Sequence, residues 1–129
     1  MKRSEAREAA FLLLFADTFT GRSVYDDILS RAQDCWDMES DEYTKTLYNG
    51  VNDNLAVLDG IINKYSTKWQ VNRLNRVMLV ALRICIYEIE TNGKADAAVY
   101  INEALELIKK YDMPDSVKYA NGVLGSYVG

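Results

Sequence analysis

Apolar residues recur at every third or fourth position along almost the whole chain, which is the pattern of amphipathic helices. No segment alternates apolar and polar residues over a length that would indicate a strand. The pattern therefore predicts an all-α fold, a compact bundle of about six to seven helices joined by tight loops. We expect a single domain over residues 1–129, because independent domains most often have about 100–150 residues.

The expected first helix begins near Ser4, a good N-cap residue, and ends at about Phe19. Its apolar residues lie on two sides, so one side can pack in the core while the other meets a partner. A second helix is expected from Ser23, because the spacing from Ser23 to Asp26 is a variant of the capping box.

A long apolar stripe continues over residues 41–65, with Gly50 and Gly60 as points where a helix can bend. The next stretch, residues 77–89, is the most apolar part of the chain and predicts a central helix that is surrounded on most sides. Two further helices are expected, one capped by Asp96 and a last one that follows Pro114.

Composition removes most classes of enzyme and metal protein. The chain has no histidine, the most common general base and metal ligand near neutral pH. Its two cysteines, Cys35 and Cys85, are far apart and each falls in an apolar periodic stretch, which indicates buried free thiols. The nearby acids Glu103 and Glu106 have no histidine partner, and no phosphate-binding glycine loop is present. We therefore expect no catalysis, no metal and no cofactor.

No segment has the pattern of a membrane-spanning helix or of a secretory signal peptide. The longest apolar run, residues 77–82, is followed by Arg83 and is far shorter than the roughly twenty residues of a membrane span. No cleavage site with small residues follows the apolar stretch of residues 9–16. These features favour a soluble, cytoplasmic protein.

Charge is distributed unevenly along the chain. The net charge is −4, which argues against a surface coated for general nucleic-acid binding. Residues 60–87, however, contain basic residues and no acidic one, so a local basic face is compatible with the acidic total.

The C-terminal segment combines cations with an aromatic residue. Lys118 and Tyr119 fall near the start of the last predicted helix, and Lys109 and Lys110 end the helix before it. Cations bind phosphates and aromatic rings stack on unpaired bases, so this arrangement is typical of single-stranded RNA binding. A tyrosine at helical spacing also fits the margin of a core, and that interpretation remains open here.

Four strings together resemble the NusB family of transcription antitermination factors. They are, in chain order, "AREAAFLLLF", "RVMLVALRICIYEI", "VYINEALELIKKY" and "DSVKYANGVL". The resemblance covers nearly the whole chain, from Ala6 to Leu124, and is weakest over residues 20–40.

The resemblance implies an all-helical fold of two three-helix sub-bundles and a role without catalysis. NusB-like proteins pair with NusE, a ribosomal small-subunit protein, and bind the single-stranded boxA element of ribosomal RNA leaders. Within the antitermination complex they keep RNA polymerase elongating past terminators. By motif, the resemblance assigns RNA contacts to Lys2, Arg3, Arg7, Lys118 and Tyr119. Asp115, next to them, is expected to weaken RNA binding by repulsion.

This chain departs from the family pattern at two places. Ser4 and Glu5 stand where several family members carry arginines, so RNA binding is expected to depend more on the partner. Met78 and Leu79 replace an acidic and basic pair near the family's NusE face, which predicts an exposed apolar contact for NusE, with Arg83 beside it, or for a second copy of the chain. The alternatives are a helical homodimer, or a module related to the NusB-like domains of ribosomal RNA cytosine methyltransferases.

Overall fold

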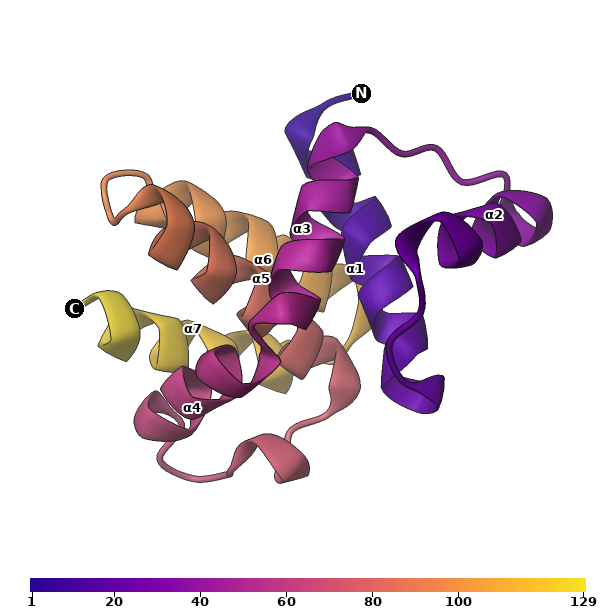
Figure 1. The fold of residues 1–129 in the computed structure, drawn as a ribbon. Coiled ribbons are helices and arrows are strands. Elements are labelled where there is room, and N and C mark those ends of the chain that lie inside the picture. Colours follow the sequence, from indigo (N-terminus) through magenta and orange to yellow (C-terminus); the bar gives the residue numbers. More distant parts are fainter. The chain divides into compact units, whose positions relative to one another are not determined.

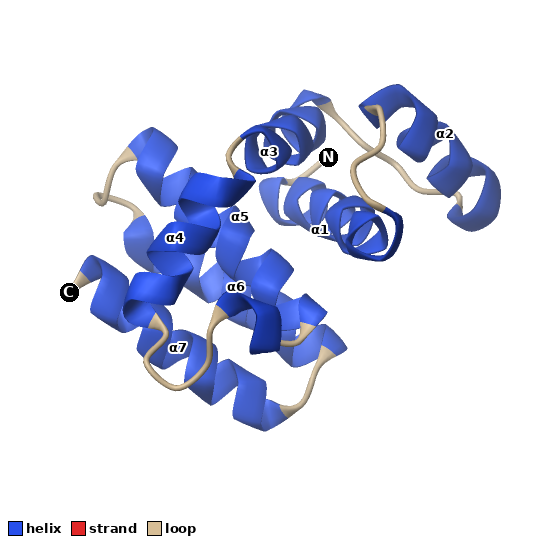
Figure 2. Cartoon of the chain, turned by 60° about the horizontal axis from the view of Figure 1, so that its bottom comes forward, coloured by secondary structure: helices blue, strands red, loops and turns tan.

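The structure is a computed structural model that describes all residues, 1–129. It contains seven α-helices and one short 3₁₀ helix and no strand (Figure 1, Figure 2), which confirms the predicted all-α fold. The elements are α1 (Arg3–Thr20), α2 (Tyr25–Trp36), α3 (Glu42–Asp53), α4 (Leu55–Tyr65), η1 (Val71–Arg73), α5 (Arg76–Asn92), α6 (Ala97–Tyr111) and α7 (Pro114–Val128).

The chain divides into two compact units, residues 1–53 and residues 54–129. The first unit holds α1, α2 and α3, as a three-helix sub-bundle requires. The second holds α4, α5, α6 and α7 with η1, so it has one α-helix more than the family resemblance implied.

The stripe over residues 41–65 forms two helices, and the break lies at Asn54 and not at Gly50 or Gly60. Asn54 is the N-cap of α4, and its carbonyl accepts a hydrogen bond from the Leu58 N–H at 2.9 Å. Asparagine favours such end positions because its short polar side chain competes for backbone hydrogen bonds within a helix. Both flanking segments are helical, so apolar spacing alone does not locate the break.

In the first unit, α1 and α3 pack against each other, and α2 contacts both helices less extensively. Within this unit the hydroxyl of Tyr48 on α3 donates a hydrogen bond to the Asp17 carboxylate on α1. The Ser23 hydroxyl is a further partner of Asp17, at 3.2 Å, so one buried carboxylate holds the connection between α1 and α2.

Both helix starts in this unit differ from the predictions. Helix α1 begins at Arg3, and the Glu5 carboxylate accepts the Lys2 N–H at 2.8 Å, so Lys2 takes the N-cap position expected for Ser4. Helix α2 begins at Tyr25 with Val24 as its N-cap. The capping box from Ser23 does not form, because Ser23 is bound to Asp17.

In the second unit, α5 is central and packs against α4, α6 and α7. Most of its side chains are buried, as the apolar composition of residues 77–89 predicts. Asn75 caps its N-terminus, where the side-chain oxygen accepts the Met78 N–H at 2.8 Å. The expected starts of the last two helices are confirmed, since Asp96 precedes α6 and α7 begins at Pro114.

The two cysteines are free thiols, as expected, but only Cys85 is buried. Cys35 lies near the end of α2 and is exposed, which corrects the expectation of two buried thiols. Cys35 lies on the same face of α2 as Ile28 and Ala32, but in the last turn of the helix, where it lines an open surface pocket and is not covered.

Candidate functional site

Tyr119 lies in the second turn of α7, and hydrogen bonds fix its hydroxyl to the segment that follows α4. The hydroxyl oxygen lies 2.7 Å from the Ser66 hydroxyl and accepts the backbone N–H groups of Lys68 at 3.2 Å and Trp69 at 3.3 Å. The phenol ring is half-buried. Tyr119 is thus neither a core residue nor a free side chain, because its polar end anchors a loop while part of its ring remains accessible.

Opposing effects act on the pKa of the Tyr119 hydroxyl. Burial raises the pKa, whereas the hydrogen bonds from Ser66 and from the backbone of Trp69 and Lys68 stabilise the phenolate and lower it. These hydrogen bonds and the positive charge of Lys68 together outweigh burial, so the pKa of Tyr119 is below its ordinary value of 10.0. The Tyr119 hydroxyl is bound to residues 66–69, so the ring of Tyr119 is the part that a ligand can contact.

Trp69 is the second aromatic residue of this site. Its ring centroid lies 4.9 Å from that of Tyr119, with the two planes inclined at 59°. The Lys68 ammonium lies 4.5 Å from the centre of the indole ring. Trp69 remains 41% exposed, although tryptophan is among the most apolar side chains. The pair therefore presents aromatic surface and a cation together.

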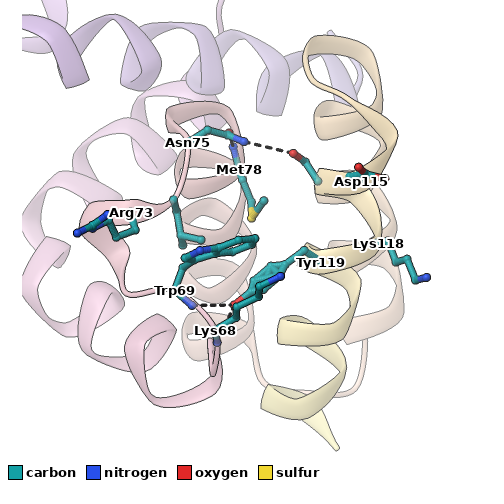
Figure 3. A pocket seen from close by; sticks show the side chains of 10 residues that line it. Lys68, Trp69, Arg73, Asn75, Met78, Asp115, Lys118 and Tyr119 are labelled. Atoms are coloured by element: carbon teal, nitrogen blue, oxygen red, sulfur yellow. Dashed lines mark hydrogen bonds between the residues drawn. The ribbon is translucent and has the colours of Figure 1, made fainter.

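These residues border a groove of about 580 Å³ within the second unit, between the segment that leads into α5 and the start of α7 (Figure 3). We call it the Trp69 groove. Its lining residues are Lys68, Trp69, Arg73, Leu74, Asn75, Met78, Asp115, Ser116, Lys118 and Tyr119. The Asn75 side-chain amide donates to the Ser116 hydroxyl at 3.2 Å and so ties the start of α5 to α7.

The charge around the Trp69 groove is mainly positive. Lys68, Arg73 and Lys118 are exposed cations, and Asp115 is the acidic residue among the lining side chains. Figure 3 shows the head groups of Arg73 and Lys118 turned outward on opposite sides of the aromatic pair. An anionic chain that crosses the groove would therefore meet a cation at each rim.

The structure brings Lys118, Tyr119 and Asp115 together at this groove, as the sequence indicated. Lys109 and Lys110 are exposed at the end of α6 but do not line it. Lys68 and Arg73 also line the groove, and both belong to the acid-free stretch over residues 60–87 for which the sequence allowed a basic face. Trp69 was missed, because residues 66–72 were expected to form only a short connection. The signal that could have identified Trp69 is a large aromatic residue in a predicted connection, flanked by the cations of this stretch.

The N-terminal cations belong to the first unit and differ in their surroundings. Lys2 and Arg3 are exposed, and the Arg3 guanidinium carbon lies 3.8 Å from the centre of the Tyr43 ring. Arg7 is only 6% exposed, and its guanidinium carbon lies 5.8 Å from the same ring. Arg7 is therefore largely covered, unlike Lys2 and Arg3, and its contact with RNA stays a prediction.

The expected partner patch at Met78 and Leu79 is not exposed. Both side chains are buried, and Met78 lines the Trp69 groove from within. Arg83 forms a two-pronged ion pair with Asp59 of α4, with both N–O distances at 2.8 Å. Met78 and Leu79 thus turn inward on α5, where burial of apolar surface stabilises the fold.

No group of potential metal ligands occurs in the structure. None of the helices has both the length and the apolar character that crossing a membrane requires.

Comparisons with known proteins agree with this architecture. The NusB family model matches residues 4–128. A transcription antitermination protein NusB from Clostridium botulinum (strain Loch Maree / Type A3) is 33% identical, and the alignment covers 99% of this chain and all of that protein.

Two solved structures have a similar fold. A T. maritima NusB structure has a TM-score of 0.84 and 28% identity, and covers 99% of this chain and 91% of that one. A crystal structure of the antitermination factors NusB and NusE in complex with dsRNA contains a chain with a TM-score of 0.84 and 25% identity. The match covers 98% of this chain and 95% of that one.

Proposed function

Because the chain belongs to the NusB family of transcription antitermination proteins, we propose that it binds boxA-type single-stranded RNA of ribosomal RNA leaders jointly with NusE. Its role is assembly without catalysis, and the assembled complex helps RNA polymerase read past terminators. We place this activity in the cytoplasm and assign it to residues 1–129 as one RNA-binding domain.

The observation that carries the proposal is the Trp69 groove. Tyr119 offers a half-buried ring beside Trp69, and Lys118 stands at the rim. Binding of single-stranded RNA commonly combines stacking on aromatic rings with cations that follow the phosphates. In this arrangement Tyr119 stacks and Lys118 neutralises a phosphate.

The exposed cations Lys2 and Arg3 supply a second electrostatic contact from the first unit. Neither contact is extensive, and the net charge of the protein is −4. A partner that adds its own RNA surface raises affinity through effective concentration, without new contacts on this chain. We therefore expect strong binding only in the complex with NusE.

The direct test is a titration of labelled single-stranded boxA RNA with the protein, with and without NusE, at two salt concentrations. A scrambled single strand and a duplex of the same sequence serve as controls. The proposal predicts tight, salt-sensitive and sequence-selective binding of the single strand when NusE is present. Equal affinity for boxA and scrambled RNA, or preference for the duplex, would contradict it. A mass that doubles with concentration, together with no binding of RNA, would favour a homodimer.

A further inference from the structure

Trp69 has features that a residue of the protein core would not have. It lies in the connection between α4 and η1, not on the buried face of a helix, and it is substantially exposed. Its segment is nevertheless held in place. The Tyr119 hydroxyl accepts a hydrogen bond from the backbone N–H of Trp69, and the side-chain oxygen of Asn63 accepts one from the backbone N–H of Val71 at 2.8 Å. The backbone that carries the indole is therefore anchored, and the ring itself packs against Tyr119, so little freedom is lost when a ligand binds.

The faces of the indole ring are only partly occupied. The Tyr119 ring is inclined at 59° to it, so the two rings cannot lie flat against each other. The Lys68 ammonium lies over the ring, but Lys68 is an exposed and flexible side chain. An exposed contact between a cation and a ring is weaker than stacking of a nucleobase on tryptophan. A base can consequently displace the ammonium from the ring.

From these contacts we infer that the Trp69 groove is a subsite for one unpaired nucleobase, which stacks on Trp69 while Lys68 moves aside to a flanking phosphate. The inference rests on the proposed function and extends it, because it adds a base-binding residue in the segment before α5 to the contacts of α7. It also predicts a preference for single-stranded RNA, since a paired base cannot leave its helix without loss of pairing and stacking.

The surroundings of the groove favour a nucleobase over a protein side chain. Its volume of about 580 Å³ lies within the usual range of small-ligand pockets, roughly 300–1,000 Å³. Arg73 and Lys118 point outward at the two rims (Figure 3), as the phosphates on either side of an inserted base require. Three cations and one acidic residue line the groove, and this balance complements a polyanion.

A set of variants tests the role of the ring. In the complex with NusE, W69A is expected to weaken binding of single-stranded boxA RNA about tenfold, the size of one lost stacking contact. W69F retains an aromatic face and should stay within about threefold of wild type. W36A is the matched control, because Trp36 is the other tryptophan and is exposed on α2. It should bind RNA as wild type does.

Fluorescence provides a readout that leaves Trp69 intact. The chain has two tryptophans, so W36F reports on Trp69 alone, and the double variant W36F/W69F gives the background from NusE. Emission is recorded as NusE is added first and unlabelled boxA RNA second. Inorganic polyphosphate, a polyanion without bases, replaces the RNA in a parallel titration. Stacking predicts quenching by RNA and none by polyphosphate.

The outcomes distinguish failure of the nucleobase subsite from failure of the proposed function. Quenching by RNA together with the loss in W69A supports the subsite. Unchanged emission while RNA binds, with wild-type affinity in W69A, overturns the subsite but leaves the proposed function in place. A change in Trp69 emission on addition of NusE alone, with none on addition of RNA, overturns it and assigns the groove to the protein partner. Failure of the wild-type complex to bind the RNA overturns the proposed function itself.

Discussion

The rings of Trp69 and Tyr119 lie 4.9 Å apart although the two residues are separated by 50 positions in the chain. The Tyr119 hydroxyl also binds the backbone of the same segment. One residue thus joins the connection after α4 to α7 and shapes the wall of the Trp69 groove. This double role means that the ring and the hydroxyl can be tested separately.

Tyr119→Phe removes the hydroxyl and keeps the ring. We expect a loss of about 1 kcal/mol in the free energy of unfolding, because hydrogen bonds to Ser66 and to two backbone N–H groups disappear while water can replace part of them. RNA affinity should fall less than in Tyr119→Ala, which removes the stacking surface. Urea unfolding and RNA titration of both variants make the comparison. Equal RNA affinity in the two variants would show that the ring makes no contact with RNA.

Asp115→Asn is expected to raise the affinity for RNA and to lower the stability of the fold. Loss of a negative charge at the groove should strengthen RNA binding roughly threefold at low salt, with a smaller gain at high salt. Asp115 also lies in the first turn of α7, where a carboxylate interacts favourably with the helix dipole, so stability should fall by about 0.3–1 kcal/mol. Glu106→Gln on α6 has the same charge change away from the groove and should alter RNA binding little. A similar gain in both variants would indicate only an effect of net charge.

Lys118→Ala should change the salt dependence of binding. A cation that neutralises one phosphate of a single strand contributes about 0.7 to the slope of log K against log salt concentration. We expect the slope to decrease by about this amount and affinity to fall for all RNA sequences alike. Thermal stability should stay near that of wild type, since Lys118 is exposed. An unchanged slope would exclude Lys118 from the phosphate contacts.

Arg7→Ala should act on folding, in contrast to Arg3→Ala. Arg7 is buried beside Tyr43, so its removal leaves a gap and should lower the melting temperature by several degrees. Arg3 is exposed, and its loss should weaken RNA binding with little change in melting temperature. Circular dichroism and RNA titration are measured on the same samples. Weaker RNA binding in Arg7→Ala without a lower melting temperature would instead show that Arg7 contacts RNA directly.

Alkaline pH should destabilise the first unit through Tyr48. Burial, followed by the hydrogen bond to Asp17, raises the pKa of Tyr48 from 10.0 to about 12. The folded state therefore favours the neutral phenol. Its contribution is complete below pH 10 and is lost as the pH rises from 10 to about 12, and amounts to roughly 2 kcal/mol.

Tyr48→Phe tests this directly. The variant should be less stable than wild type at pH 8, because Asp17 loses its hydroxyl partner, and the difference should shrink as the pH approaches 12. Urea unfolding at a series of pH values gives both curves. A difference that stays constant from pH 8 to pH 12 would contradict the raised pKa.

Local signals in the sequence predicted much of the fold. Apolar spacing predicted the helices, and Asp96 and Pro114 marked the starts of α6 and α7. The break at Asn54 was missed because the apolar stripe runs through it, and the two glycines offered more obvious points for a bend. The start of α2 was predicted at Ser23, but Ser23 instead binds Asp17 at the end of α1. Capping rules consider only residues within the first turn of the same helix, so they do not foresee this contact.

The candidate site was predicted only in part. The C-terminal motif identified Lys118, Tyr119 and Asp115, which share one helix. Trp69 lies in an irregular connection, where periodicity carries no information, and its neighbour is far away in the chain. Met78 and Leu79 were expected on the surface, but a central helix that is apolar on most sides does not reveal from its sequence which residues face outward.

The most direct test of the central claim is the affinity of Tyr119→Ala for single-stranded boxA RNA in the complex with NusE, measured together with the melting temperature and the affinity for NusE. The account predicts RNA binding weakened about tenfold, with NusE binding retained and the protein still folded at the assay temperature. Wild-type RNA affinity combined with a lower melting temperature would contradict it, because Tyr119 would then serve only to hold the segment after α4 against α7.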